Sequence, residues 1–162
     1  MSVIDTLITD RTQADVDRVL YLQSKGFAAM TTAEQNEFLT DMKGAYNASD
    51  LNRIGEACAF VRDKEISLAL PVSSSLIIRT NWAFGEIPTS ADLSNIINTI
   101  NALKSALSLT TPETPATLNQ PTFEVANRLE EILVMCNTLC ENIVATYVYC
   151  GQPYCGQIWG EF

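Results

Sequence analysis

The chain has 162 residues, 10 basic and 19 acidic side chains, a net charge of −9 and no histidine. Its apolar content of 47% is enough for one core or two small ones and argues against a disordered chain. The excess negative charge opposes nucleic-acid phosphates and anionic membrane surfaces, so we expect neither as a partner.

The ends and the cysteines indicate a soluble product made in the cytoplasm. Residues 1–5 lack the basic start and the long apolar run of a signal peptide, and no uncharged apolar stretch reaches the roughly 20 residues of a membrane span. The cysteines are odd in number and do not have the spacing of a secreted disulfide framework, so we expect reduced thiols. They are Cys58, Cys136, Cys140, Cys150 and Cys155.

One helix-opening pattern occurs three times: a small residue, an aspartate, and an aliphatic residue that recurs three positions later. The aspartates are Asp15, Asp50 and Asp92. Each places a carboxylate on the exposed amides of a first helical turn. The starts at Asp15 and Asp50, with a further start signal at Thr31 and Glu34 and glycine stops at Gly26 and Gly44, predict three short helices within residues 12–66 and an N-terminal module over residues 1–68.

Residues 69–162 are predicted to form a second module. Pro71 breaks the third helix, and residues 76–78 are rich in β-formers but too short for a firm strand. An apolar stripe after Pro88 and a longer one after Thr122, joined by the stiff connector at residues 111–115, predict two helices that pack as an antiparallel hairpin. The fold class is therefore mainly α, with two small helical modules.

The last residues, 147–162, are predicted to form a short β-like or extended C-terminal arm, because they are rich in glycine and contain a direct repeat, Tyr-Cys-Gly-Gln, at Tyr149 and Tyr154. An arm so aromatic needs a surface to cover, on its own helices or on a neighbouring subunit. Trp82 and Trp159 could instead stack on sugars or simply seal loops, and we favour sealing. The candidate interaction residues are Trp82, Tyr149, Tyr154, Ile158, Trp159 and Phe162.

No residue pattern indicates catalysis, a cofactor or a metal. The lack of histidine removes the commonest general base and most catalytic zinc sites. Glu130 and Glu131 point about 100° apart on a helix, so we interpret them as solvent-facing charges. The spacing of the last four cysteines permits a zinc site, or a Cys150–Cys155 disulfide, but Cys136 and Cys140 lie on an apolar stripe where free cysteine acts as a small hydrophobe. No glycine-rich phosphate loop occurs.

Two segments of the N-terminal half carry a resemblance: TLITDRTQADVDRV at residues 6–19 and KGAYNASDLNRIG at residues 43–55. They resemble a structural module of tailed-phage and prophage proteins of Firmicutes. The second half resembles a companion module. The shared motifs are Thr-Asn-Trp at residues 80–82, Ile-Pro-Thr at residues 87–89, a Glu-x-Ala-Asn helix opening at residues 124–127, and the terminal Tyr-x-Gly repeats. That pattern usually has Ser where this chain has Cys150 and Cys155, which further weakens a metal role.

The resemblance implies a non-enzymatic virion structural protein whose partners are other virion proteins and further copies of itself in a homo-oligomer. The resemblance also implies that the protein is associated with the tail, fibre or baseplate of the particle. No catalytic residues carry over from the resembling modules. A glycan- or receptor-binding module of a phage fibre, using the tryptophans and the terminal tyrosines, is the alternative, and a small prophage regulator is a third.

Overall fold

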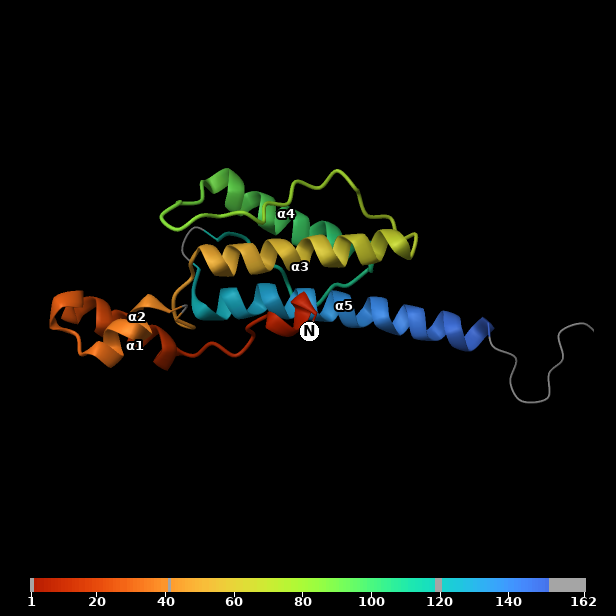
Figure 1. Cartoon of the computed structure of the whole chain (residues 1–162). Coiled ribbons are helices and arrows are strands. Elements are labelled where there is room, and N and C mark those ends of the chain that lie inside the picture. The colour runs from red at the N-terminus through yellow and green to blue at the C-terminus, as the bar shows by residue number, and fades with distance from the viewer. Residues whose placement is uncertain (1, 41, 119–120, 152–162) are drawn as a thin grey trace, which may run out of the picture.

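A computed structural model describes residues 2–40, 42–118 and 121–151, with side chains described up to residue 146. Five α-helices dominate these residues, no strand occurs among them, and the predicted mainly α class is confirmed (Figure 1). The elements in chain order are the short 3-10 helix η1 (Val3–Thr6), α1 (Gln13–Lys25), η2 (Phe27–Ala29), α2 (Thr32–Leu39), α3 (Ala48–Ser67), α4 (Ser90–Ala106) and α5 (Phe123–Gly151).

Capping boxes begin the first four α-helices. In α1, the Thr12 hydroxyl accepts the Asp15 N–H while the Asp15 carboxylate accepts the Thr12 N–H at 2.7 Å, and this bonding to Thr12 lowers the pKa of Asp15. The same reciprocal pair opens α2, α3 and α4, so polar groups of the first turn that would otherwise lack partners are satisfied. The repeated aspartates therefore mark helix starts, as predicted.

Helix α3 is the centre of the molecule, because α4, α5 and η1 all pack against it. Its buried side chains Ile54 and Val61 share one core with Ile100 of α4 and Leu133 of α5. The module boundary predicted at residue 68 therefore does not divide this core, since α3 lies before it and α4 and α5 lie after it. The described residues of α3, α4 and α5 form one three-helix bundle.

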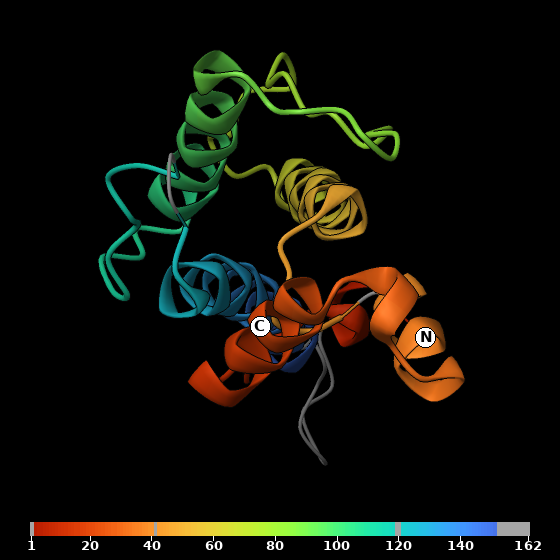
Figure 2. The same ribbon diagram turned by 90° about the vertical axis from the view of Figure 1, so that its left-hand side faces the viewer.

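The three bundle helices run in the same general direction, and the predicted antiparallel hairpin of α4 and α5 is wrong (Figure 1). Arg53 pairs with Glu130 and Lys64 with Glu141, so α3 and α5 advance together, and Figure 2 shows both nearly end-on. Parallel neighbours require long connections, whereas short loops favour antiparallel ones. Residues 107–122 provide such a return: the Lys104 ammonium at the end of α4 holds their first part through the carbonyl of Pro112 at 2.5 Å.

Helices α1 and α2 form a lobe at the end of the bundle where α3 and α5 begin (Figures 1 and 2). Two ion pairs join them, Arg18 to Glu37 at 2.5 Å and Lys25 to Glu34 at 2.7 Å, around the buried Leu22. The Lys25 ammonium, with the Thr31 N–H, lowers the pKa of Glu34 to about 2. The lobe is thus a small unit that must be attached to the bundle by other contacts.

Helix α5 is longer than the sequence predicted. The expected side chains Leu129, Ile132 and Leu133 are fully buried, while Ile143 is only half-buried. The helix continues through Gly151, so the stretch expected to leave the helix at residue 147 is helical for five residues more. The rest of the predicted arm, residues 152–162, lies outside the described residues.

Candidate interaction site where the lobe meets the bundle

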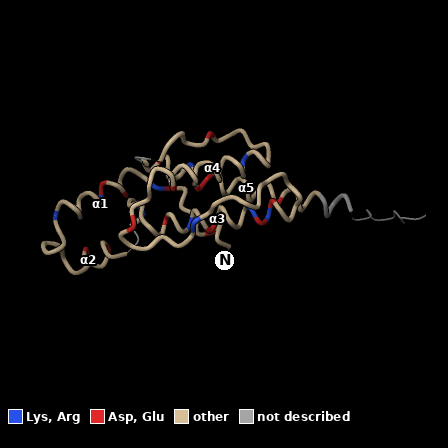
Figure 3. The backbone as a smooth tube through the Cα atoms, turned by 90° about the horizontal axis from the view of Figure 1, so that it is seen from above, with Lys and Arg blue, Asp and Glu red and all other residues tan. Residues whose placement is uncertain are grey.

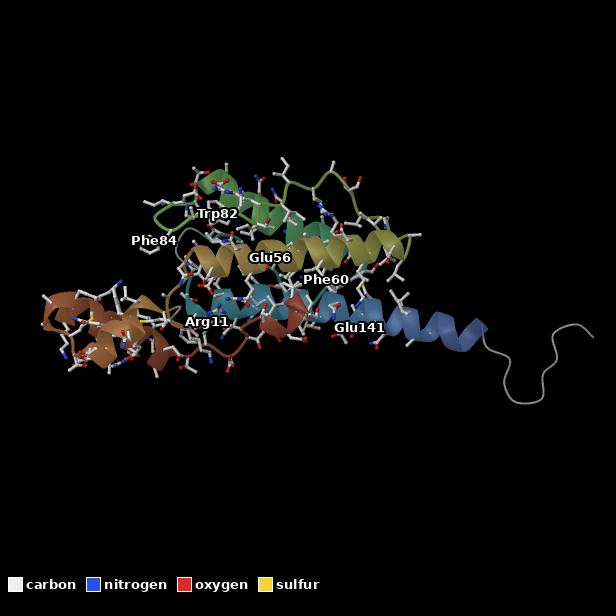
Figure 4. All side chains as sticks on the ribbon, viewed as in Figure 1. Arg11, Glu56, Phe60, Trp82, Phe84 and Glu141 are labelled. Carbon is white, nitrogen blue, oxygen red and sulfur yellow. The ribbon has the colours of Figure 1, made fainter. Side chains whose placement is uncertain are left out.

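Four buried or half-buried charged side chains meet where the lobe joins the bundle. The Arg11 guanidinium donates from Nη2 to Asp50 Oδ1 at 2.8 Å and to Glu130 Oε1 at 2.7 Å. Arg53 donates to Glu130 at 2.9 and 3.1 Å and also pairs with Asp50. Arg11, labelled in Figure 4, comes from the segment before α1, Asp50 and Arg53 from α3, and Glu130 from α5, so this charge network ties three parts of the chain together.

Backbone groups complete the network. The second oxygen of Glu130 accepts the Ile8 N–H at 2.5 Å, and the Asn127 side chain both accepts the Arg11 N–H at 3.0 Å and donates to the Arg11 carbonyl at 2.9 Å. Asp50 Oδ2 accepts the Asn47 N–H in the α3 capping box, which leaves Oδ1 for the arginines. All four carboxylate oxygens therefore accept hydrogen bonds.

Burial sets the electrostatics of this network. Glu130 is 0% exposed and Arg11 and Asp50 are each 4% exposed, so the two positive and two negative charges compensate one another largely away from water. Burial by itself would lower the pKa of Arg53, but the hydrogen bonds and charge of Glu130 and Asp50 outweigh it and raise that pKa. Carboxylates so fully engaged are poor general bases, and the arrangement acts as a clamp.

Tyr46 covers the clamp on the lobe side. Its ring centroid lies 5.9 Å from the Arg11 guanidinium carbon, within the range of a cation–π contact. Burial, together with the negative charges of Glu130 and Asp50, raises the pKa of the Tyr46 hydroxyl. Nearby, Gly44 touches α1 so closely that an added Cβ would lie 2.1 Å from the Asp15 carbonyl oxygen. Only glycine allows this approach of the segment to the lobe.

A groove of about 550 Å³ lies beside the clamp, between the lobe, the start of α3 and the loop at residues 82–84. Large apolar side chains shape it: Leu39 is 72% exposed, and Phe84 is fully exposed at the loop tip (Figure 4). None of the described residues that line it carries a charge. They are Val19, Gln23, Phe38, Leu39, Thr40, Met42, Ala45, Asn47, Ala48, Ser49, Asn52, Trp82 and Phe84.

Trp82 is a wall of this groove and is only 6% exposed. The Arg79 guanidinium stacks on its ring with 3.7 Å between carbon and centroid, and Asn52 holds its backbone by accepting the N–H at 2.6 Å and donating to the carbonyl at 3.0 Å. The preceding loop lies directly on α3, since a Cβ at Gly55 would be 2.2 Å from the Arg79 carbonyl oxygen. This geometry matches a sealing role and leaves little ring face for a sugar.

The other sequence-predicted interaction residues are not brought to Trp82 by the described structure. Tyr149 lies in α5, but its side chain is outside the description, and Tyr154, Ile158, Trp159 and Phe162 lie beyond the last described residue. Cys58, Cys136 and Cys140 are buried free thiols, and burial raises the pKa of Cys58 and Cys136 to about 12. Among the described residues, no group of three or more potential ligands could hold a metal ion.

Sequence reasoning missed two buried glutamates. Glu131 is exposed, as predicted, but Glu130 is fully buried, so its interpretation as a solvent-facing charge was wrong. Its buried position depends on Arg11, more than a hundred residues away in sequence. Glu65 is also fully buried, and no described donor lies within hydrogen-bonding distance of either oxygen. Burial raises its pKa to about 8. A signal existed here, because Glu65 continues the helical spacing of Cys58 and Val61.

Comparisons with known proteins add no relative: no family model, no curated protein and no solved structure matches this chain. Within the described part of the chain, no helix is both long and apolar enough to cross a bilayer.

Proposed function

We propose that this chain is a structural protein of a phage or prophage virion, associated with the tail, which works by self-association and by docking to other virion proteins. The observation that carries the proposal is a coincidence of sequence and geometry. The two segments that resemble phage modules, residues 6–19 and 43–55, contain Arg11, Asp50 and Arg53, three of the four clamp residues. The segments that resemble phage modules therefore contain residues that attach the lobe to the bundle.

A clamp of this kind suits a structural protein that must keep the lobe in a fixed orientation on the bundle. The lobe is joined to α3 and α5 by charge-assisted hydrogen bonds whose geometry is specific in direction, unlike apolar packing alone. Outside the clamp, charged residues are spread over both lobe and bundle (Figure 3), and a net charge far from zero keeps such a protein soluble before assembly.

Exposed apolar side chains supply candidate docking points. Ile77, Phe84 and Ile87 are 75%, 102% and 88% exposed, and all three belong to the long connection between α3 and α4. Isolated exposed apolar residues are common, but several on one connection favour a contact surface. The stacking of Arg79 on Trp82 favours this structural role over the alternative of glycan binding.

The proposal is tested on purified particles of the phage or induced prophage that carries the gene. Mass spectrometry should find the chain in stoichiometric amount, and gold-labelled antibody should mark the tail. Light scattering of the purified full-length protein should give a mass above that of one chain. Particles that lack the protein would contradict the virion assignment, and a monomer at every concentration would contradict self-association.

A further inference from the structure

The described lining of the groove and residues 142–160 share one property, the absence of charged side chains. Charged residues make up 18% of the chain, yet none lines the groove among the described residues, and none occurs in residues 142–160. A charged group buried in an interface without a partner is costly, so two uncharged surfaces can meet without that penalty. The groove also presents Phe38, Trp82 and Phe84, which suit apolar and aromatic side chains.

We propose that the groove receives residues 152–160 of a second copy of this chain, an inference that rests on the self-association proposed above. Ile158 and Trp159 are the anchors in that segment. The groove volume of about 550 Å³ lies within the roughly 300–1,000 Å³ of sites that enclose small molecules, which is room for such side chains. Tryptophan and tyrosine are also the residues that most often dominate the free energy of an interface.

The length of the chain excludes the same contact within one copy. Phe84, which lines the groove, lies beyond the first turn of α5 along the bundle (Figure 4), and that turn begins at Phe123. Gly151 is 28 residues from Phe123, which is about 42 Å at about 1.5 Å per residue. Trp159 follows Gly151 by eight residues and can reach back at most about 29 Å when fully extended. It therefore falls short of its own groove.

The contact is head-to-tail, because α5 carries the terminal segment away from the end of the bundle that bears the groove (Figure 1). Such a heterologous contact uses two different surfaces and generates a ring when the rotation closes and a filament when it does not. An open assembly therefore has one free groove at one end and one free terminal segment at the other until it closes.

The test uses two full-length variants that each block one surface. Leu39→Glu with Phe84→Glu introduces charge into the groove at two exposed positions, and Trp159→Glu introduces it into the terminal segment. The matched control is Leu20→Glu, at a position of α1 in the same lobe that is 55% exposed and is not part of the groove lining. Phe84→Glu alone, at a fully exposed side chain, serves if the double variant loses its circular dichroism signal.

Light scattering should show an oligomer for the wild type and the Leu20→Glu control, and monomers for each blocked variant at the same concentration. Loss of an aromatic anchor should raise the dissociation constant by at least about thirtyfold. Mixed together, the two blocked variants still hold one intact groove and one intact end, so they should form a one-to-one complex and no larger species.

Each other outcome overturns the inference in a distinguishable way. If the groove variants keep the wild-type mass, the groove assignment is wrong while self-association stands. If both blocked variants are monomers but their mixture forms no one-to-one complex, the two surfaces do not meet each other. If the wild type is a monomer at every concentration, self-association itself fails and the inference fails with it.

Discussion

Two fully buried glutamates, Glu130 and Glu65, lie at the α3–α5 interface, and their surroundings are opposite. Glu130 accepts hydrogen bonds from Arg11, Arg53 and the Ile8 N–H. Glu65, toward the other end of α3, has no described hydrogen-bond partner and lies near the Cys136 and Cys140 thiols, whose pKa values are raised first by burial and then by the negative charge of Glu65. A glutamate at one end of the α3–α5 interface is therefore an ionised member of the clamp, whereas a glutamate toward the other end favours its protonated form.

The difference teaches what a buried charge requires. An ionised carboxylate is tolerated in a protein interior when donors from several chain segments converge on it, and otherwise its neutral form is favoured. At Glu130 those donors come from the segment before α1 and from α3, so the charge is retained where the lobe is attached. At Glu65 no described donor lies within hydrogen-bonding distance of either carboxylate oxygen.

Removal of the partnered glutamate should have the largest effect. Glu130→Ala leaves Arg11 and Arg53 with one carboxylate between them, and breaking a buried pair on one side costs about 3–5 kcal/mol. Urea denaturation should show this loss in the free energy of unfolding. Glu131→Ala, at the exposed neighbouring position, is the control and should change it by no more than about 0.5 kcal/mol. Equal losses would mean that the clamp contributes nothing specific.

The unpartnered glutamate should make stability depend on pH in the opposite sense to a paired carboxylate. Its pKa is about 8 in the folded chain against an ordinary value of 4.5, so the folded state binds more protons between these values. Stability from this group is complete below pH 4.5 and falls as the pH rises to about 8, by an amount on the order of 2–4 kcal/mol.

Glu65→Gln tests this, because glutamine has nearly the same shape and does not titrate. Thermal melts at several pH values should show a decline from mildly acidic to mildly basic conditions in the wild type and a flatter profile in the variant. A variant profile parallel to that of the wild type would show that Glu65 ionises without cost and would remove the contrast between the two glutamates.

Asp50 takes part in both the clamp and the capping box of α3, so substitution at this position can distinguish the contributions of the two. Asp50→Asn keeps an oxygen for the cap but removes the charge between two arginines, and we expect a loss of about 1–3 kcal/mol. Asp92→Asn is the matched control, because Asp92 occupies the same capping-box position in α4 and is bonded only to Thr89. The control should lose about 0.5 kcal/mol or less in chemical denaturation. Matching losses would assign the whole role of Asp50 to capping.

The smallest effect is expected from Arg11→Lys. The charge remains, but one ammonium cannot reproduce the fork that bonds Asp50, Glu130 and the Ile8 carbonyl, so we expect a loss of about 1 kcal/mol. Proteolysis between η1 and α1, followed over time, should quicken as this segment opens more often. An unchanged cleavage rate would show that Asn127 and Tyr46 hold the segment without the arginine fork.

The sequence by itself determined where the helices begin and which residues line the core. Thr12 with Asp15 and Thr89 with Asp92 are capping boxes that act within one helical turn, and the apolar stripe of α5 has a period that fixes Leu129 and Leu133 on one face. These are local properties, and local spacing is what a sequence displays directly.

Only the tertiary structure decided how the helices run and which glutamate is buried with partners. Residues 107–122 are long enough to join α4 and α5 in either direction, and packing selected the parallel one. Glu130 and Glu131 have nearly the same sequence neighbourhood, yet only Glu130 meets Arg11, a contact that spans most of the chain. The energy of such a contact depends on donors brought together by the whole fold, so spacing along the chain could not reveal it.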